Sequence, residues 1–281
     1  MSFIGDLHTH SLFSDGTDSP RDLVHRGKER GLRALALVDH DTVGGLEEFL
    51  TEAEANGIEG IPGVEISTSI KGTRIHILGY FIDYQDPSLL SFLNKMSVAR
   101  TKNTEEILSK LGYLDLLHYS WEGVLRHNQN KSWICSSDVF TAMLNDGLYS
   151  NYEQWPGFYH EYFGKESKAY LDLDNFSPTE AIEVILNAKG ISVLAHPKLI
   201  GDDTKIKELI ESGLMGLEVH YPVHGKQDVE HYLHITKKNN LLVTGGTDWH
   251  GKLSEWEAFL GEYGIDEEGL SQLKYRRDCI K

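Results

Sequence analysis

The sequence predicts an α/β fold, a distorted seven-stranded β/α barrel with a mostly helical segment inserted into it. Three observations predict it. Short apolar runs alternate with helical patterns over most of the 281 residues, which is typical of parallel βα units. Seven such runs are present, which fits a seven-stranded barrel better than an eight-stranded one. The alternation breaks once, over residues 87–170, where an insertion is expected.

The part of the chain before the insertion is expected to contribute four strands, over residues 4–10, 33–40, 61–67 and 74–82. Ser19-Pro20 is a typical N-cap followed by proline in the first helical turn, and it opens a helix that ends at residue 31. A second helix is expected over 45–56. Since only Lys71-Gly72 separates the third and fourth strands, these two are expected to pair as an antiparallel hairpin.

Residues 87–170 are expected to form a helical cap subdomain, so that the barrel domain consists of residues 1–86 and 171–281. Helices are predicted over 89–111 and 137–148. An aromatic cluster follows, which we expect to be a hydrophobic core rather than a cofactor site; it comprises Tyr149, Tyr152, Trp155, Phe158, Tyr159, Tyr162 and Phe163.

Regular alternation resumes after the insertion and supplies the other three strands, over 191–196, 216–221 and 241–247. Ser177-Pro178 repeats the N-cap pattern and opens a helix that ends near residue 189. Further helices are predicted over about 203–212, 226–239 and 267–277.

Net charge and composition disfavour two classes of partner, long nucleic acids and membranes. The net charge of −16 disfavours a long nucleic acid, which normally needs a basic surface, but it allows a small phosphorylated substrate. The sequence shows no apolar run long enough to span a membrane and no secretory signal pattern, so no membrane partner is expected. Cys135 and Cys279 cannot make a disulfide framework. The cytoplasm is therefore the expected location.

His8 and His10 are the first candidate metal ligands in the sequence. In an extended strand, residues two apart point to the same face, so both imidazoles can reach one ion, and Asp15 follows closely. An isolated His-x-His more often binds nothing. The remaining strands therefore decide whether a metal site exists.

Histidines and carboxylates recur at almost every predicted strand, mostly at its end, and the C-terminal ends of parallel barrel strands form the face that holds active sites. Nine nitrogen and oxygen ligands are expected there: His8, His10, Asp15, His40, Glu65, His76, His196, Asp248 and His250. This number is too large for one ion and fits two to three divalent ions. Imidazole with carboxylate suits Mn, Fe or Zn. Clustered ions of this kind favour hydrolysis of a phosphate ester.

The motifs resemble those of the PHP (polymerase and histidinol phosphatase) family. They are Asp6-Leu-His-Thr-His-Ser, Ser14-Asp-Gly-Thr, Val38-Asp-His-Asp, Gly63-Val-Glu-Ile-Ser, Ile75-His-Ile-Leu-Gly-Tyr, Leu194-Ala-His-Pro and Gly245-Gly-Thr-Asp-Trp-His-Gly. Within the family, the chain is most similar to the stand-alone metal-dependent phosphoesterases of the nucleotide 3′,5′-bisphosphate phosphatase branch.

The resemblance implies a trinuclear site. One ion would take His8, His10, Glu65 and Asp248; a second would take Glu65 as a bridge with His76 and His196; a third would take Asp15, His40 and His250. It also implies a metal-bridging hydroxide as nucleophile, with Asp248 or His224 protonating the leaving oxygen. Lys198, His224 and Arg100 are the expected substrate contacts.

One departure concerns the substrate. Members of the nucleotide branch usually carry Arg-Pro-His-Ile-Ala in the insertion, where this chain has Ser136-Ser-Asp-Val-Phe. The expected substrate is therefore a nucleoside 3′,5′-bisphosphate or a related sugar or cyclic phosphate. Three alternatives remain open: a 5′-3′ exonuclease on short RNA, a histidinol-phosphate phosphatase, and a non-catalytic metal-binding module.

Overall fold

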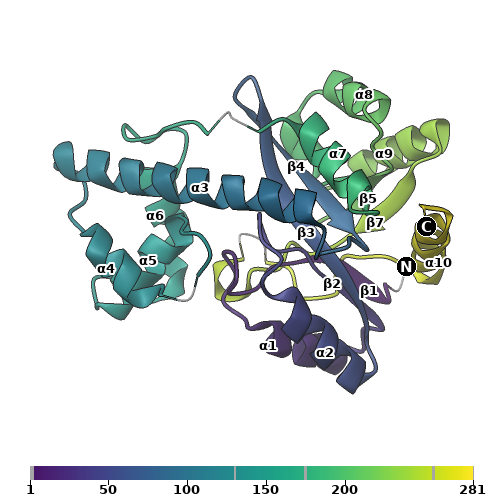
Figure 1. Ribbon diagram of the computed structural model, residues 1–281, viewed down its shortest axis with the longest axis horizontal. Helices are drawn as coiled ribbons and strands as arrows, with labels where there is room; N and C mark the ends of the chain where they lie inside the picture. Colours follow the sequence, from purple (N-terminus) through teal and green to yellow (C-terminus); the bar gives the residue numbers. More distant parts are fainter. Residues whose placement is uncertain (1–2, 130, 174–175, 255–256, 281) are drawn as a thin grey trace.

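The computed structural model describes residues 3–129, 131–173, 176–254 and 257–280, and its strands form one sheet in chain order (Figure 1). They are β1 (Gly5–Thr9), β2 (Ala34–Leu37), β3 (Glu59–Ile70), β4 (Thr73–Tyr80), β5 (Ile191–Leu194), β6 (Gly216–His220) and β7 (Leu242–Gly245). The sheet nearly closes, because the segment after β7 rejoins β1. There the Trp249 N–H donates to the His8 carbonyl at 3.1 Å. The predicted seven-stranded barrel is confirmed.

Two glycines permit this close approach. A Cβ built on Gly246 would lie 2.3 Å from the Cβ of His8, and one built on Gly264 would lie 1.9 Å from the carbonyl oxygen of Gly5. No side chain fits at either distance, so only glycine allows the end of the chain to pack directly on β1.

The strands do not all run in one direction. Pairing is parallel from β1 to β3 and from β5 to β7, whereas β4 is antiparallel to both of its neighbours. The expected hairpin is therefore present, and Lys71 (φ 49°) and Gly72 (φ 75°) form its turn. Because β4 is reversed, its first half reaches the mouth at which the other strands end. This is why His76, opposite Ser67 of β3, lies at that mouth.

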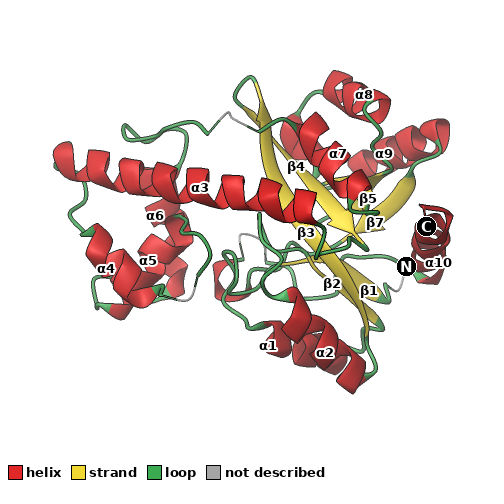
Figure 2. Cartoon of the chain, in the orientation of Figure 1, coloured by secondary structure: helices red, strands yellow, loops and turns green. Residues whose placement is uncertain are grey.

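Helices cover the outside of the barrel (Figures 1 and 2). They are α1 (Pro20–Glu29), α2 (Leu46–Asn56), α7 (Pro178–Asn187), α8 (Asp203–Glu211), α9 (Lys226–Asn239) and α10 (Glu267–Ile280). Ser19 caps α1 as predicted, since its hydroxyl accepts from the Asp22 N–H at 3.1 Å. Gly57, with φ 69°, ends α2 in the left-handed conformation.

The insertion contains α3 (Pro87–Tyr113), α4 (Trp121–His127), α5 (Ser136–Asn145), η1 (Tyr152–Gln154), α6 (Trp155–Phe158) and the π-helical turn η2 (Tyr159–Phe163). The first half of α3 packs on the barrel core through Leu93 and Met96. Its second half packs through Leu111 into a separate cluster that holds Phe140 and Phe158. Thus α3 belongs to two cores and fixes the insertion to the barrel. Within the described residues, no helix is long and apolar enough to cross a bilayer.

Candidate metal centre

All nine predicted ligands meet at the barrel mouth. His8 lies in β1, Glu65 in β3 and His76 in β4, while His10, Asp15, His40, His196, Asp248 and His250 lie in segments that follow strands. The backbone turns sharply at two of these positions, since His196 (φ 31°) and Asp248 (φ 54°) adopt left-handed conformations. Such conformations are costly for residues other than glycine and gather at functional sites.

Glu65 stands at the centre of the cluster. Its Oε2 lies 3.0 Å from His8 Nε2, 3.1 Å from His10 Nε2 and 3.4 Å from His40 Nδ1. Its Oε1 lies 2.9 Å from His76 Nδ1 and 3.2 Å from His196 Nε2. One fully buried carboxylate therefore contacts five imidazoles from four segments of the chain. This is the arrangement expected of a ligand that bridges ions.

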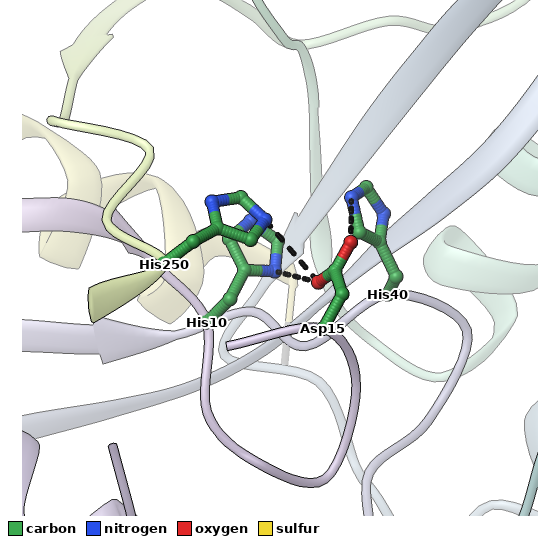
Figure 3. A group of neighbouring side chains, drawn as sticks. All are labelled: His10, Asp15, His40 and His250. Carbon is green, nitrogen blue, oxygen red and sulfur yellow. Dashed lines mark ion pairs between the residues drawn. The ribbon is translucent and has the colours of Figure 1, made fainter. Parts of the chain in front are cut away.

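The ligand atoms form three overlapping groups, and within each group they lie within 4.8 Å of one another. The groups are His8, His10, Glu65 and Asp248; His10, Asp15, His40 and His250; and His40, Glu65 and His76. The first equals the set expected for the first ion. In the second, Asp15 lies between His250 Nε2, at 3.2 Å, and His40 Nε2, at 3.8 Å (Figure 3). The third contains Glu65 and His76 of the set expected for the second ion but has His40 in place of His196, whose Nε2 lies 3.2 Å from Glu65 Oε1. The assignment of individual ligands stays a prediction.

Unsatisfied polar atoms show that these residues fit metal ions. Both ring nitrogens of His10, Oδ1 of Asp15 and Oδ1 of Asp248 are buried and have no hydrogen-bond partner among the described residues. His10 Nε2 and Asp248 Oδ1 face each other at 3.1 Å. Buried polar groups normally have partners, and imidazole and carboxylate lone pairs that converge on one point suit a cation.

The electrostatics of the site agree with this fit. Burial acts to raise the pKa of Glu65 and of Asp248, but the surrounding imidazoles outweigh it and hold both pKa values well below the usual range. Burial acts to lower the pKa of His250, yet Asp15 and Asp248 raise it to about 10. The carboxylates are therefore ionised at neutral pH and attract positive charge to the mouth of the barrel.

Two carboxylates that the sequence analysis did not identify support the ligands. Glu218, fully buried in β6, places Oε1 2.8 Å from His8 Nδ1 and accepts from the His196 N–H at 2.8 Å. Asp6 accepts from the Thr247 hydroxyl at 2.6 Å and ties β1 to the segment after β7. Hydrogen bonds to the far ring nitrogen orient a ligating histidine and fix its tautomer. A glutamate within the apolar run of β6 was the only sequence signal for Glu218.

A cavity of ≈ 670 Å³ opens over the ligand groups and reaches the insertion. Its walls include Arg100, Trp133, Ser136 and Ser137. The Arg100 guanidinium lies 3.0 Å from Asp41 Oδ2 and 4.6 Å over the Trp133 ring. Residues 136–140, the stretch that departs from the nucleotide branch, thus form the first half of α5, and Ser136 and Ser137 line the cavity.

Lys198 and His224, two of the predicted substrate contacts, do not line this cavity. Lys198 Nζ points to Asp228 Oδ2, at 2.6 Å. His224 is buried, its Nδ1–H donates to the Val219 carbonyl at 2.9 Å, and its ring lies 5.4 Å from that of Tyr221. Tyr221 does line the cavity and donates to Asp248 Oδ2 at 2.8 Å. The roles of Lys198 and His224 stay predictions.

Comparison with known proteins decides the family. The family model described as "PHP domain" matches residues 6–175, more than half of the chain. The chain belongs to the PHP domain family. The resemblance inferred from the motifs is confirmed.

Several relatives of this PHP protein have assigned activities. It is 28% identical over 254 residues to a phosphoribosyl 1,2-cyclic phosphate 1,2-diphosphodiesterase from Eggerthella lenta, covering 89% of this chain and 95% of the relative. It is 35% identical over 197 residues to a 5′-3′ exoribonuclease from Haemophilus influenzae, covering 68% of each chain. It is 28% identical over 250 residues to a 3′,5′-nucleoside bisphosphate phosphatase from Chromobacterium violaceum, covering 87% of this chain and 86% of the relative.

A solved structure agrees with these relatives. A Bifidobacterium adolescentis protein described as a candidate metal-dependent phosphoesterase superposes with a TM-score of 0.86 at 28% identity, covering 97% of this chain and 96% of that one. The comparisons confirm the predicted class, a metal-dependent phosphoesterase.

Proposed function

We propose that this PHP protein hydrolyses a small phosphate ester, either a nucleoside 3′,5′-bisphosphate or a related sugar or cyclic phosphate. One observation carries the proposal: three imidazole–carboxylate groups, which overlap at His10, His40 and Glu65, lie at a cavity of ≈ 670 Å³. Cavities of this volume are typical of small-molecule sites. Relatives that act on cyclic phosphate and nucleoside bisphosphate substrates support the same class.

The three groups provide ligands for two to three divalent ions, with Mn, Fe and Zn as the metals that suit imidazole and carboxylate donors. When bound, such ions lower the pKa of a water molecule and neutralise phosphate oxygens during in-line displacement. The chain's own part is to hold the ligands. Glu218 orients His8, Tyr221 restrains Asp248, and Glu65 joins two of the groups.

Protonation of the leaving oxygen is assigned to Asp248 or His224, as the sequence predicts. Asp248 faces the cavity, but its pKa lies well below the usual range because the His8 and His250 imidazoles outweigh the effect of burial. Burial lowers the pKa of His224. This ring can donate a proton only in its protonated form and through Nε2, because the Val219 carbonyl holds Nδ1–H. An H224Q variant separates the two roles. Lost turnover with full metal content supports His224, whereas unchanged turnover leaves Asp248.

We also propose that residues 87–170 act as a cap that completes the cavity. Arg100 and Trp133, both from this segment, form one wall opposite the ligand groups. The acidic net charge of −16 and this enclosing wall support a small phosphorylated substrate rather than a long nucleic acid.

The test is phosphate release by the purified, Mn-loaded protein. The panel holds adenosine 3′,5′-bisphosphate, a ribose cyclic phosphate, histidinol phosphate and p-nitrophenyl phosphate. A His196→Ala variant should lose turnover, whereas His25→Ala, which changes an exposed histidine of α1, should retain it. Absence of turnover on every compound would refute the proposal.

The Haemophilus influenzae relative favours a second candidate, exonucleolytic removal of nucleotides from the 5′ end of short RNA. Substrate length separates the candidates. Equal rates on 5′-phosphorylated oligonucleotides of two to ten nucleotides would support the exonuclease. A steep fall beyond a dinucleotide would support the small-phosphate enzyme, because the acidic surface gives a longer strand no counter-charge.

A further inference from the structure

The cavity has a second end, away from the ligand groups, where the β3–β4 hairpin meets the end of the insertion. Figure 1 shows the loop after η2 running beside this hairpin, and Lys165 from that loop donates to the Gly72 carbonyl at 2.7 Å. Arg74 of β4, together with Tyr159 and Tyr170, lines the same end. These residues carry no part of the proposed metal centre.

Of the described cations that line the cavity, Arg74 and Lys165 have no carboxylate partner, whereas Arg100 does. The Arg74 Nη1–H donates to the Tyr159 hydroxyl at 2.8 Å, and its side chain is exposed. Six arginines of the described residues pair with a carboxylate, and Arg74 is not among them; they are Arg21, Arg26, Arg33, Arg100, Arg126 and Arg277. Arg100, by contrast, pairs with Asp41 at 3.0 Å. An arginine held by a neutral phenol in a cavity keeps its full charge for a ligand.

Arg74 lies on the same strand, β4, as the predicted ligand His76. Arg74 and His76 are two residues apart on β4, so their side chains leave the same face, with Cα atoms about 7 Å apart. A ligand at the imidazole of His76 can therefore extend along the strand to Arg74. The one carboxylate lining this end among the described residues is Asp172, whose Oδ1 accepts from the Tyr170 hydroxyl at 3.1 Å.

We propose that Arg74, aligned by Tyr159 and flanked by Lys165, binds a second anionic group of the substrate and selects esters that carry one. This inference rests on the proposed function, because the first phosphate must lie at the ligand groups. Arg74 is then a specificity residue, distant from the bond that breaks. A charged hydrogen bond of this kind changes affinity roughly 10- to 100-fold.

The test compares adenosine 3′,5′-bisphosphate with adenosine 3′-monophosphate, which differ by one phosphate. We expect wild-type protein to favour the bisphosphate in kcat/KM. R74Q should lower kcat/KM for the bisphosphate roughly 10- to 100-fold and change that for the monophosphate by less than about twofold. R74K should restore part of the preference. The matched control is R33Q, which removes an equal charge from a residue paired with Glu267, away from the cavity, and should keep the wild-type ratio.

Equal losses on the two substrates, or no loss on either, would overturn the role of Arg74. If wild-type protein hydrolyses neither, the proposed function has failed, and calorimetric binding of the bisphosphate tests Arg74 separately. Weaker binding to folded R74Q than to R33Q then supports the subsite. Equal binding, or no binding to wild-type protein, overturns it. If R74Q does not fold, Y159F, which releases the guanidinium from its phenol, replaces it with a smaller expected loss.

Discussion

Replacing Glu218 by glutamine tests how the barrel holds its ligands. The carboxylate has two fixed neighbours, His8 Nδ1 at 2.8 Å and the His196 N–H at 2.8 Å. It accepts from both, which leaves the lone pair of His8 Nε2 free to face Glu65 and Asp248. A glutamine of the same shape can accept through one oxygen only, so its amide NH₂ must face the other neighbour. Either orientation conflicts with one ligand.

The size of the effect follows from this conflict. If the amide NH₂ faces His8, Nδ1 must become an acceptor, and Nε2 then carries the proton and cannot bind an ion. If the NH₂ faces the His196 N–H, two donors meet in a fully buried position. Loss of an outer-shell partner typically reduces metal affinity 10- to 100-fold, which corresponds to about 1.4–2.7 kcal/mol. Because both orientations are unfavourable, we expect E218Q to lie near the upper end.

The assay is calorimetric titration of metal-depleted protein with Mn, combined with elemental analysis after dialysis. E48Q makes the same change of charge on an exposed residue of α2 and should bind Mn as wild-type protein does. Circular dichroism establishes that E218Q is folded. Wild-type affinity and stoichiometry in folded E218Q would refute the role assigned to Glu218.

Three further changes give distinct outcomes. His8→Ala should remove one ion and most turnover while far-UV circular dichroism is kept, since it deletes a ligand of the first group; metal content equal to that of wild-type protein would contradict the assignment. Iodoacetamide at pH 8 should label Cys279 and leave Cys135 intact in the mass spectrum, because burial raises the pKa of the Cys135 thiol to about 12; two fast adducts would count against this. Lys131→Met should lower the free energy of unfolding by about 3 kcal/mol in urea denaturation, because it leaves the buried Asp138 without its ion pair; a loss below 1 kcal/mol would disprove it.

The sequence was sufficient for the fold, and the predicted ligand positions come together in the structure, because both depend on local patterns. Short apolar runs between helical patterns mark strands, and a histidine at the end of a parallel strand lies at the mouth of a βα barrel. Helix α4 was missed, since seven residues that include Gly123 leave too short a pattern to recognise. The contribution of Glu218 was missed for another reason. Its contact with His8 joins residues 210 positions apart and exists only once the sheet has curled.

The residues that line the cavity were harder to predict, because their positions depend on the direction that the chain takes after a strand ends. Lys198 follows His196 closely, and its contact with the substrate stays a prediction. The left-handed backbone of His196 (φ 31°) leads directly into η3 (Pro197–Ile200), and the ammonium group of Lys198 lies beside Asp228 of α9. The position of Arg74 in the cavity could not be predicted, because no neighbouring residue in the sequence indicates a cavity. Its setting comes from Tyr159, 85 residues away.

Helix α3 packs in two hydrophobic cores, so the barrel that carries the predicted ligands and the insertion that forms part of the cavity wall have separate supports. Its first half packs in the barrel core with Met96, and its second half packs in the insertion core with Leu111. Arg100 lies between these halves and faces the cavity. The ligands come from the strands, whereas much of the opposite wall comes from α3, α5 and the following loop, which have their own core. Ser136 and Ser137 line this wall, so we expect their substitution to change contacts with the substrate and to leave Glu65 and the histidines around it in place.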